Sequence, residues 1–164
     1  METDRRRMAP QVGIVMSCRS EWETMRAASE ILTDFDISHE QCVLAPYAVE
    51  RILKQISDFE AQGFRILIVS GAAYLPGLLA AHTTLPVLGV PIPSRSFRGL
   101  DSLVAMVQMP RGLPVGTLAI GEAGAANAAL FAVSILALTD RTIRERLQAF
   151  RERQTRSVLD DRLP

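Results

Sequence analysis

The chain has 164 residues, of which 48% are hydrophobic and 22% charged, and its 18 basic and 18 acidic side chains cancel. This composition excludes a collagen, a coiled coil and a disordered chain, and the length is that of one domain with a full hydrophobic core. A net charge of zero also removes the electrostatic basis for binding nucleic acid or an anionic membrane, so a small molecule or another subunit is the expected partner.

The two cysteines, Cys18 and Cys42, are far apart and show no CxxC spacing. This favours free thiols in a reducing compartment over a disulfide framework or a zinc site. His39 and His82 have no partner cluster, so neither a metal nor another cofactor is expected. The first ten residues lack the apolar run of a signal peptide, and no stretch is long and apolar enough to span a bilayer. We therefore expect a cytoplasmic protein.

Short apolar runs rich in β-branched residues alternate with helical patterns along the chain. Residues 11–16 predict a first strand, and Ser20 with Glu23 three residues later predicts a capping box that opens the first helix. Further strands are predicted at 39–44, 65–69, 86–90 and 115–120, and further helices at 49–59, after the small-residue loop 70–77, at 101–108 and at 123–138. Strands alternating with helices at this spacing predict a three-layer α/β sandwich built on a parallel sheet.

Charge is distributed unevenly along the chain. Residues 70–138 contain five charged side chains, whereas residues 140–164 contain seven arginines and five acids. A charge-poor segment is typical of surfaces covered by other subunits, or of a parallel sheet covered on both faces. The mixed signs after Asp140 predict a solvated terminal helix. The chain is thus divided into a flexible N-terminal segment (1–10), an α/β domain (11–140), and a C-terminal helix and tail (141–164).

Ligands of such sheets bind outside the carboxyl ends of the strands, where the strand order reverses. Three loops qualify, at residues 17–21, 45–47 and 70–76, and backbone N–H groups at the helix start in the first loop favour an anion there. The candidate ligand-binding residues are Ser17, Ser20, Ala45, Pro46, Tyr47, Ser70, Gly71, Ala72, Ala73, Leu75 and Pro76.

Two long segments, VQMPRGLPVGTLAIG (107–121) and AGAANAAL (123–130), are near-contiguous signatures. Together with GIVMSCRSEW (13–22) and SGAAYLPG (70–77), they resemble the PurE family, the carboxyaminoimidazole ribonucleotide mutases of purine synthesis. The resemblance covers about residues 11 to 140. It implies a flavodoxin-like parallel sheet and a homo-octamer in which each active site lies where neighbouring subunits meet.

The three loops depart from the family's pattern. The family reads G-S-x-S-D-W where this chain has SCRSEW (17–22), S-A-H-R-T-P where it has LAPYAV (44–49), and G-G-A-A-H-L-P where it has SGAAYLP (70–76). In the family, the histidine of the second loop carries the proton and the arginine beside it holds the substrate phosphate. Pro46 and Tyr47 occupy these positions, so the resemblance implies a site without its usual proton carrier or phosphate clamp.

Cys18, Tyr74 and Glu21 are the candidates for chemistry. Cys18 lies beside Arg19 at a helix start, which favours a reactive thiol, or it simply fills the place of the family's serine. Tyr74 could exchange a proton, stack on a flat ligand or fill an emptied pocket. The same alternatives apply to Tyr47, for which contact with a ligand is favoured because it lies in a loop at a strand end. Glu21 could bind ligand hydroxyls, as the family's aspartate does for ribose, or complement the helix dipole.

Three functions stay open, ranked in this order. The first is an enzyme that has reused the mutase pocket for a small planar or carboxylate-bearing substrate, by carboxylation, decarboxylation, isomerisation or cyclisation in a specialised pathway. The second is a non-catalytic ligand-binding paralogue, and the third is the purine mutase itself. An acid beside a thiol in the first loop favours an enzyme, whereas a pocket filled by Pro46, Tyr47 and Tyr74 favours a binder.

Overall fold

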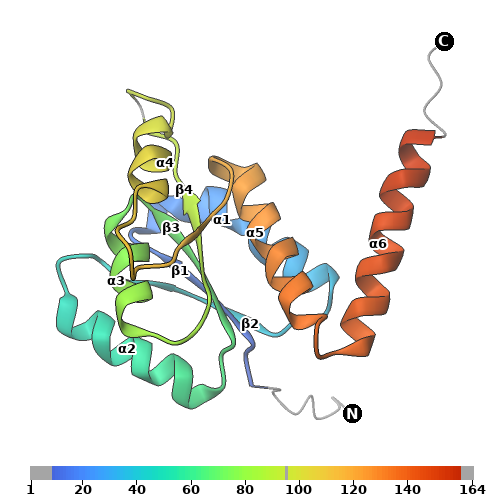
Figure 1. Cartoon of the computed structure of the whole chain (residues 1–164), viewed down its shortest axis with the longest axis horizontal. Coiled ribbons are helices and arrows are strands. Elements are labelled where there is room, and N and C mark those ends of the chain that lie inside the picture. The colour runs from blue at the N-terminus through green and yellow to red at the C-terminus, as the bar shows by residue number, and fades with distance from the viewer. Residues whose placement is uncertain (1–8, 95, 160–164) are drawn as a thin grey trace.

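A computed structural model describes residues 9–94 and 96–159, which form a parallel sheet between two layers of helices (Figure 1). The strands are β1 (Val12–Met16), β2 (His39–Val43), β3 (Ile66–Gly71), β4 (Val87–Pro91) and β5 (Gly116–Thr117). The helices are α1 (Trp22–Asp34), α2 (Val49–Gln62), α3 (Tyr74–His82), α4 (Leu100–Val107), α5 (Gly121–Leu136) and α6 (Arg141–Leu159), with one 3-10 turn, η1 (Arg19–Glu21). Most of the predicted N-terminal segment 1–10 lies outside the described residues, and the division at residue 140 stays a prediction.

The strand order is β2-β1-β3-β4-β5, and every pairing is parallel. This order confirms the flavodoxin-like prediction, because the chain first moves outward from β1 to β2 and then crosses back to β3. The order therefore reverses between β1 and β3. The carboxyl ends of these two strands are where a ligand site is expected.

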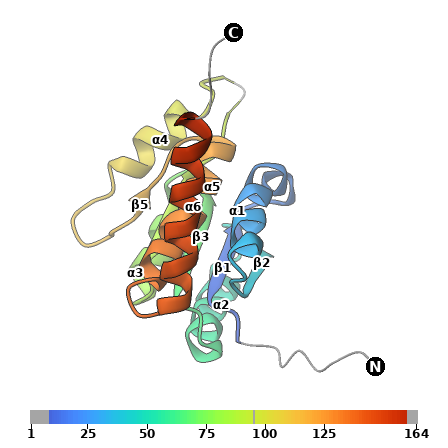
Figure 2. The ribbon, with the colours of Figure 1, turned by 90° about the vertical axis from the view of Figure 1, so that its right-hand side faces the viewer.

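Two hydrophobic clusters hold the helices on the sheet. Val12, Ile14 and Met16 of β1 pack with α1 and α5 on one face, whereas Val15 packs with α2 and α3 on the other. All five residues of β1 are buried, as expected for a strand covered on both faces. Outside α5 lies α6, on the side away from the sheet (Figures 1 and 2).

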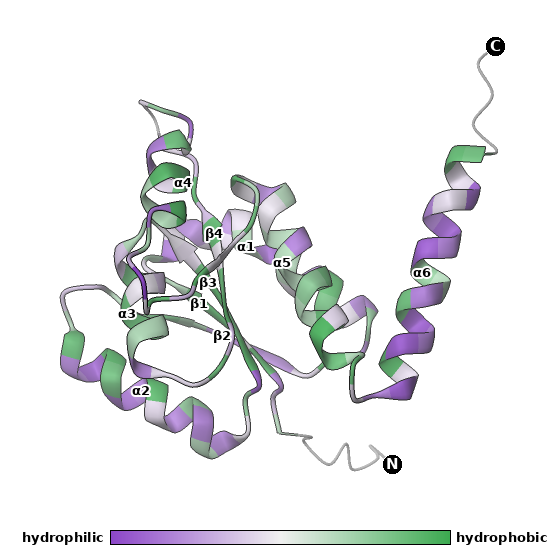
Figure 3. Cartoon of the chain, in the orientation of Figure 1, coloured by the Kyte–Doolittle hydropathy of each residue, from purple (hydrophilic) through white to green (hydrophobic). Residues whose placement is uncertain are grey.

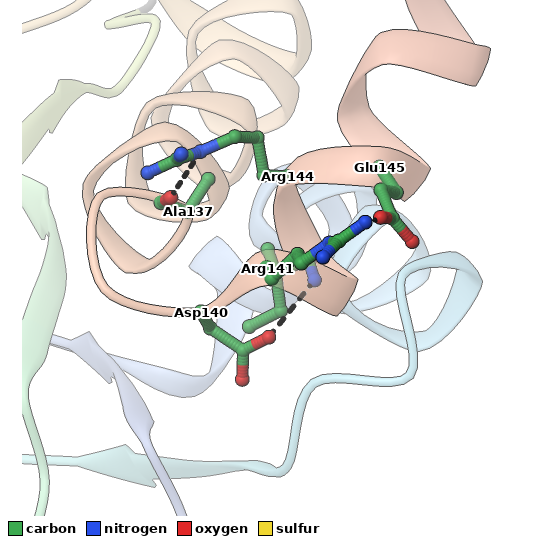
Figure 4. Close-up of polar contacts among 6 residues, drawn as sticks. Ala137, Asp140, Arg141, Arg144 and Glu145 are labelled. Carbon is green, nitrogen blue, oxygen red and sulfur yellow. Dashed lines mark hydrogen bonds and ion pairs between the residues drawn. The ribbon is translucent and has the colours of Figure 1, made fainter.

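A tight corner leads the chain from α5 into α6 (Figure 4). The guanidinium of Arg144 donates to the backbone carbonyls of Ala137 and Leu138, both at 3.0 Å, and so satisfies carbonyls at the end of α5. The carboxylate of Asp140 accepts a hydrogen bond from the Ile143 backbone N–H at 3.1 Å, as an N-cap side chain does. These contacts fix the orientation of α6 relative to α5.

The predicted terminal helix is present as α6, and hydrophilic residues occupy much of its length (Figure 3). Only Ile143 of this helix is buried. Within the described part of the chain, no helix has the length and apolar character needed to cross a membrane.

The last strand is shorter than predicted. Residues 115–120 were expected to be extended, but β5 covers only Gly116–Thr117 and pairs with β4 alone. It is an edge strand, and edge strands in native sheets are commonly short. Gly121, the first residue of α5, has a φ of +75°, a conformation that favours glycine.

Candidate functional site

Three loops meet at the carboxyl edge of the sheet. Residues 17–21 follow β1, and residues 70–76 begin at the end of the neighbouring strand β3. The predicted loop 45–47 follows β2, and the ends of β1 and β2 are joined because the Leu44 N–H donates to the Met16 carbonyl at 2.8 Å. The structure thus brings together the three loops that the sequence singled out.

The centre of the site is the carboxylate of Glu21, a residue that is only 8% exposed. The backbone N–H of Ser17 donates to Oε2 at 2.8 Å, and the Ser17 hydroxyl donates to Oε1 at 2.6 Å. The hydroxyl of the fully buried Ser70 donates to Oε2 at 2.7 Å. No arginine or lysine of the described residues pairs with this carboxylate. The three donors and the adjacent start of α1 therefore compensate its charge.

Gly71, which is buried, lies beside this cluster. Its φ is +120°, in the region that favours glycine, and a Cβ built on it would lie 3.8 Å from both Glu21 Oε1 and Ser17 Oγ. A side chain at residue 71 would therefore contact these two oxygens.

The capping box predicted from Ser20 and Glu23 is wrong. Residues 19–21 form the turn η1, so Ser20 lies inside that turn instead of in front of α1, and the residue at the N-cap, Glu21, makes no side-chain capping bond. The Ser20 hydroxyl instead lies 3.1 Å from the Cys18 Sγ. Cys18 is exposed, so its thiol faces the solvent at the site.

Both tyrosines of the site are exposed. Tyr74, the first residue of α3, is 56% exposed, and Tyr47 is 89% exposed. Neither plugs a pocket within the subunit. Leu75 and Pro76, which the sequence placed among the ligand-binding residues, are buried, so their side chains face the protein interior.

Ser70 and Gly71, also predicted as ligand-binding residues of the third loop, are buried like Leu75 and Pro76, whereas the remaining predicted residues of the second and third loops are more accessible. Ala45, Pro46 and Ala73 are half-buried, and Ala72 is exposed. They offer backbone groups and small apolar surfaces to a ligand, but no ionisable side chain. Any acid or base in these two loops must therefore be one of the tyrosines.

A hollow of about 290 Å³ lies beside this edge, at the ends of β1 and β2. Its lining residues are Met16, Arg19, Trp22, Gln41, Cys42 and Val43. Sequence reasoning did not select these residues, although Arg19 and Trp22 flank the first loop. The hollow adds an aromatic ring and a cation to the surroundings of the site.

The two thiols should differ in reactivity. Burial raises the pKa of Cys42 to about 11, so roughly one thousandth of it is thiolate at pH 8, whereas Cys18 is exposed. We expect iodoacetamide at pH 8 to modify Cys18 first, as followed by peptide mass spectrometry. A Cys18→Ser variant serves as control and should react slowly. Faster labelling of Cys42 would contradict this prediction.

The histidines and acids do not gather into a metal centre in the part of the chain that the structure describes. His39 is engaged instead by its neighbours, with Nε2 at 2.8 Å from the Ser29 hydroxyl and Nδ1 at 2.9 Å from the Ile37 carbonyl. These contacts fasten β2 to α1. The ring of His39 thus has a structural role.

Comparison with known proteins gives the family. The sequence model of the AIR carboxylase family matches residues 11–157. N5-carboxyaminoimidazole ribonucleotide mutase of Vibrio vulnificus is 49% identical over 152 residues, and that of Vibrio parahaemolyticus is 47% identical over 152, covering 91% of this chain and 94% of either relative. The crystal structure of Treponema denticola PurE superposes with a TM-score of 0.84 at 22% identity, over 93% of this chain and 96% of that one, and supports the fold. The chain belongs to the AIR carboxylase family.

Proposed function

We propose that this chain is an enzyme that shifts the carboxylate of a planar aminoimidazole, and that N5-carboxyaminoimidazole ribonucleotide is its first candidate substrate. The observation that carries the proposal is the identity of 47–49%, over 91% of the chain, to proteins with that mutase name. Such a substrate is both planar and carboxylate-bearing. A cytoplasmic location is part of the proposal, and the free cysteines Cys18 and Cys42 support it.

In this proposal, the residues of the three loops have different roles in binding and proton transfer. Glu21 and Ser17 hold donor groups of the substrate through Glu21 Oε1 and Ser17 Oγ. The phenol of Tyr74 and the thiol of Cys18 are the proton carriers, because both are exposed at this edge and Pro46 has no ionisable group. Tyr47 contacts the substrate from the second loop.

The test is an assay with the carboxyl-labelled ribonucleotide. We expect transfer of a ¹³C-carboxyl label from nitrogen to carbon, observed by NMR, at a rate about 10² to 10⁴ below that of the Vibrio relatives, because the general acid/base histidine is absent. The Tyr74→Phe and Cys18→Ser variants should lower this rate further. Absence of transfer at enzyme concentrations equal to the substrate would overturn the proposal.

A second candidate is a substrate of the same planar, carboxylated kind without a phosphoribosyl group. The observation in its favour is the second loop, in which Pro46 and Tyr47 provide no cation for a phosphate. Calorimetric affinities for the ribonucleotide and for the corresponding free carboxylated imidazole distinguish the two candidate substrates. Tighter binding of the free heterocycle favours the second candidate, and binding of either without label transfer leaves a ligand-binding role.

We also propose that the chain assembles as a homo-octamer. α4 exposes Leu100, Val104 and Val107, which lie on one side of the helix, and Phe131 of α5 is 49% exposed. A groove of about 540 Å³ between α5 and α6 has a mixed lining, whose apolar part includes Leu130, Phe131, Leu147 and Phe150. Neighbouring subunits would cover these surfaces.

Light scattering should therefore give a mass about eight times the 18.0 kDa of the chain. Val104→Glu places a charge in the exposed stripe of α4 and should shift the mass downward, because a buried unpaired charge at an interface is costly. Glu30→Gln, an exposed change on α1, is the control. A stable monomer of the unaltered protein would disprove the assembly.

A further inference from the structure

We propose that Ser70 is a positioning residue that locks the Glu21 carboxylate, so that Glu21 and Ser17 present only hydrogen-bond acceptors to a substrate. The sequence placed Ser70 among the ligand-binding residues, whereas its side chain is fully buried behind Glu21. The inference deepens the proposed function, on which it rests for the choice of substrate. It states which kind of substrate group binds at Glu21 and Ser17, namely a hydrogen-bond donor.

The acceptor to which each hydroxyl donates its proton decides whether the cluster offers donors or acceptors to a ligand. A serine hydroxyl has one proton to donate. In Ser17 it goes to Glu21 Oε1 at 2.6 Å, and in Ser70 it goes to Oε2 at 2.7 Å, which is shorter than the 3.3 Å to the Val15 carbonyl. The Ser17 backbone N–H is also taken, by Oε2 at 2.8 Å. The Ser17 N–H and the two serine hydroxyls are therefore not available as donors to a ligand.

Two oxygens of the cluster keep a lone pair that none of the contacts above uses. They are Ser17 Oγ and Glu21 Oε1, the two atoms beside the bare Cα of Gly71. Ser17 is half-buried and thus within reach of the solvent. A hydroxyl or amino group of a substrate satisfies these acceptors, whereas a phosphate or carboxylate oxygen meets lone pairs of the same sign.

Ser70 is the contact that fixes the carboxylate to the sheet. Ser17 is four residues from Glu21 in the same loop, so the two can move together. Ser70 is 49 residues away, on the central strand β3, and is fully buried. A carboxylate held by a residue of a buried strand keeps a defined place relative to the substrate, which is what a binding group requires.

The three positions also differ together from the family's pattern. Ser17 and Ser70 stand where that pattern reads glycine, and Glu21 stands where it reads aspartate. Here the two added hydroxyls both donate to the lengthened acid. The three residues therefore behave as one unit, and a change in one should alter the effect of a change in another.

Kinetics and crystallography of Ser70→Ala test the proposal. We expect KM for N5-carboxyaminoimidazole ribonucleotide to rise about 10-fold with little change in kcat, because a hydrogen bond that aligns a binding group has been lost. Crystal structures of the unaltered protein and of the variant should show the Glu21 carboxylate in one position in the former and displaced in the latter. In a Glu21→Ala background, Ser70→Ala should have no further effect on KM.

The control is Ser102→Ala, which removes a buried serine hydroxyl from α4 and should leave KM unchanged. A Glu21 carboxylate that keeps its place in crystals of Ser70→Ala would overturn the proposal. A double variant whose rise in KM equals the product of the rises in Ser70→Ala and in Glu21→Ala would also overturn it. If the unaltered protein does not turn over the ribonucleotide, the proposed function fails, and the two crystal structures still decide whether Ser70 positions Glu21.

Discussion

The double variant Pro46→His/Tyr47→Arg should turn over N5-carboxyaminoimidazole ribonucleotide about 10² to 10⁴ times faster than the unaltered chain. The histidine adds a general acid/base group, which typically contributes this factor, and the arginine adds a guanidinium that pairs with the substrate phosphate. The loop tolerates the change because Tyr47 is 89% exposed and Pro46 is half-buried. The measurement is the label-transfer assay, with kcat and KM determined separately.

Two single variants and one matched double variant make this result specific. Pro46→His alone should raise kcat, whereas Tyr47→Arg alone should lower KM, since the first moves a proton and the second binds the phosphate. Pro46→Ala/Tyr47→Ala removes the same two side chains without adding chemistry and should give no gain. Failure of Pro46→His, Tyr47→Arg and their double variant to gain activity would mean that the second loop does not face this substrate, and would favour the second candidate.

The fold was predictable because its signals are local and strong. Apolar runs rich in β-branched residues predicted the strands, and the apolar periodicity of residues 49–59 predicted α2, which ends at Gly63 with a φ of +90°. The alternation of strands and helices then allowed few topologies. The length of β5 was not predictable in the same way, because it depends on how far the chain follows β4 at the sheet edge.

The site was predictable in location and only partly in detail. The loops after β1 and β3 follow from the strand order alone. The partners of Glu21 do not, because Ser70 reaches it across 49 residues of sequence. The capping box was predicted from a three-residue spacing alone. This prediction failed at Ser20 because residues 19–21 form a 3-10 turn and the Glu21 carboxylate accepts hydrogen bonds from Ser17.

Glu21→Ala and Glu21→Gln should separate the structural role of this residue from its functional role. Alanine leaves the buried Ser70 hydroxyl and the Ser17 N–H without their acceptor and should lower the free energy of unfolding by about 2 to 4 kcal/mol. Glutamine has nearly the same shape. Its oxygen can keep the bonds made to Oε2, and its amide can donate to the Ser17 hydroxyl, so the loss should be only about 1 kcal/mol. Urea unfolding measures both values.

Glu21→Gln should lose activity although it keeps most of the stability, because glutamine replaces the acceptor Oε1 by a donor. The polarity that the substrate meets beside Gly71 is then reversed, even though the fold is kept. We expect kcat/KM of Glu21→Gln to fall about 10- to 100-fold, the range of a lost hydrogen bond to a charged acceptor, and thus close to the value for Glu21→Ala. A Glu21→Gln protein with full activity would show that the carboxylate serves only to hold the loop, since its stability and its chemistry would then depend on shape alone.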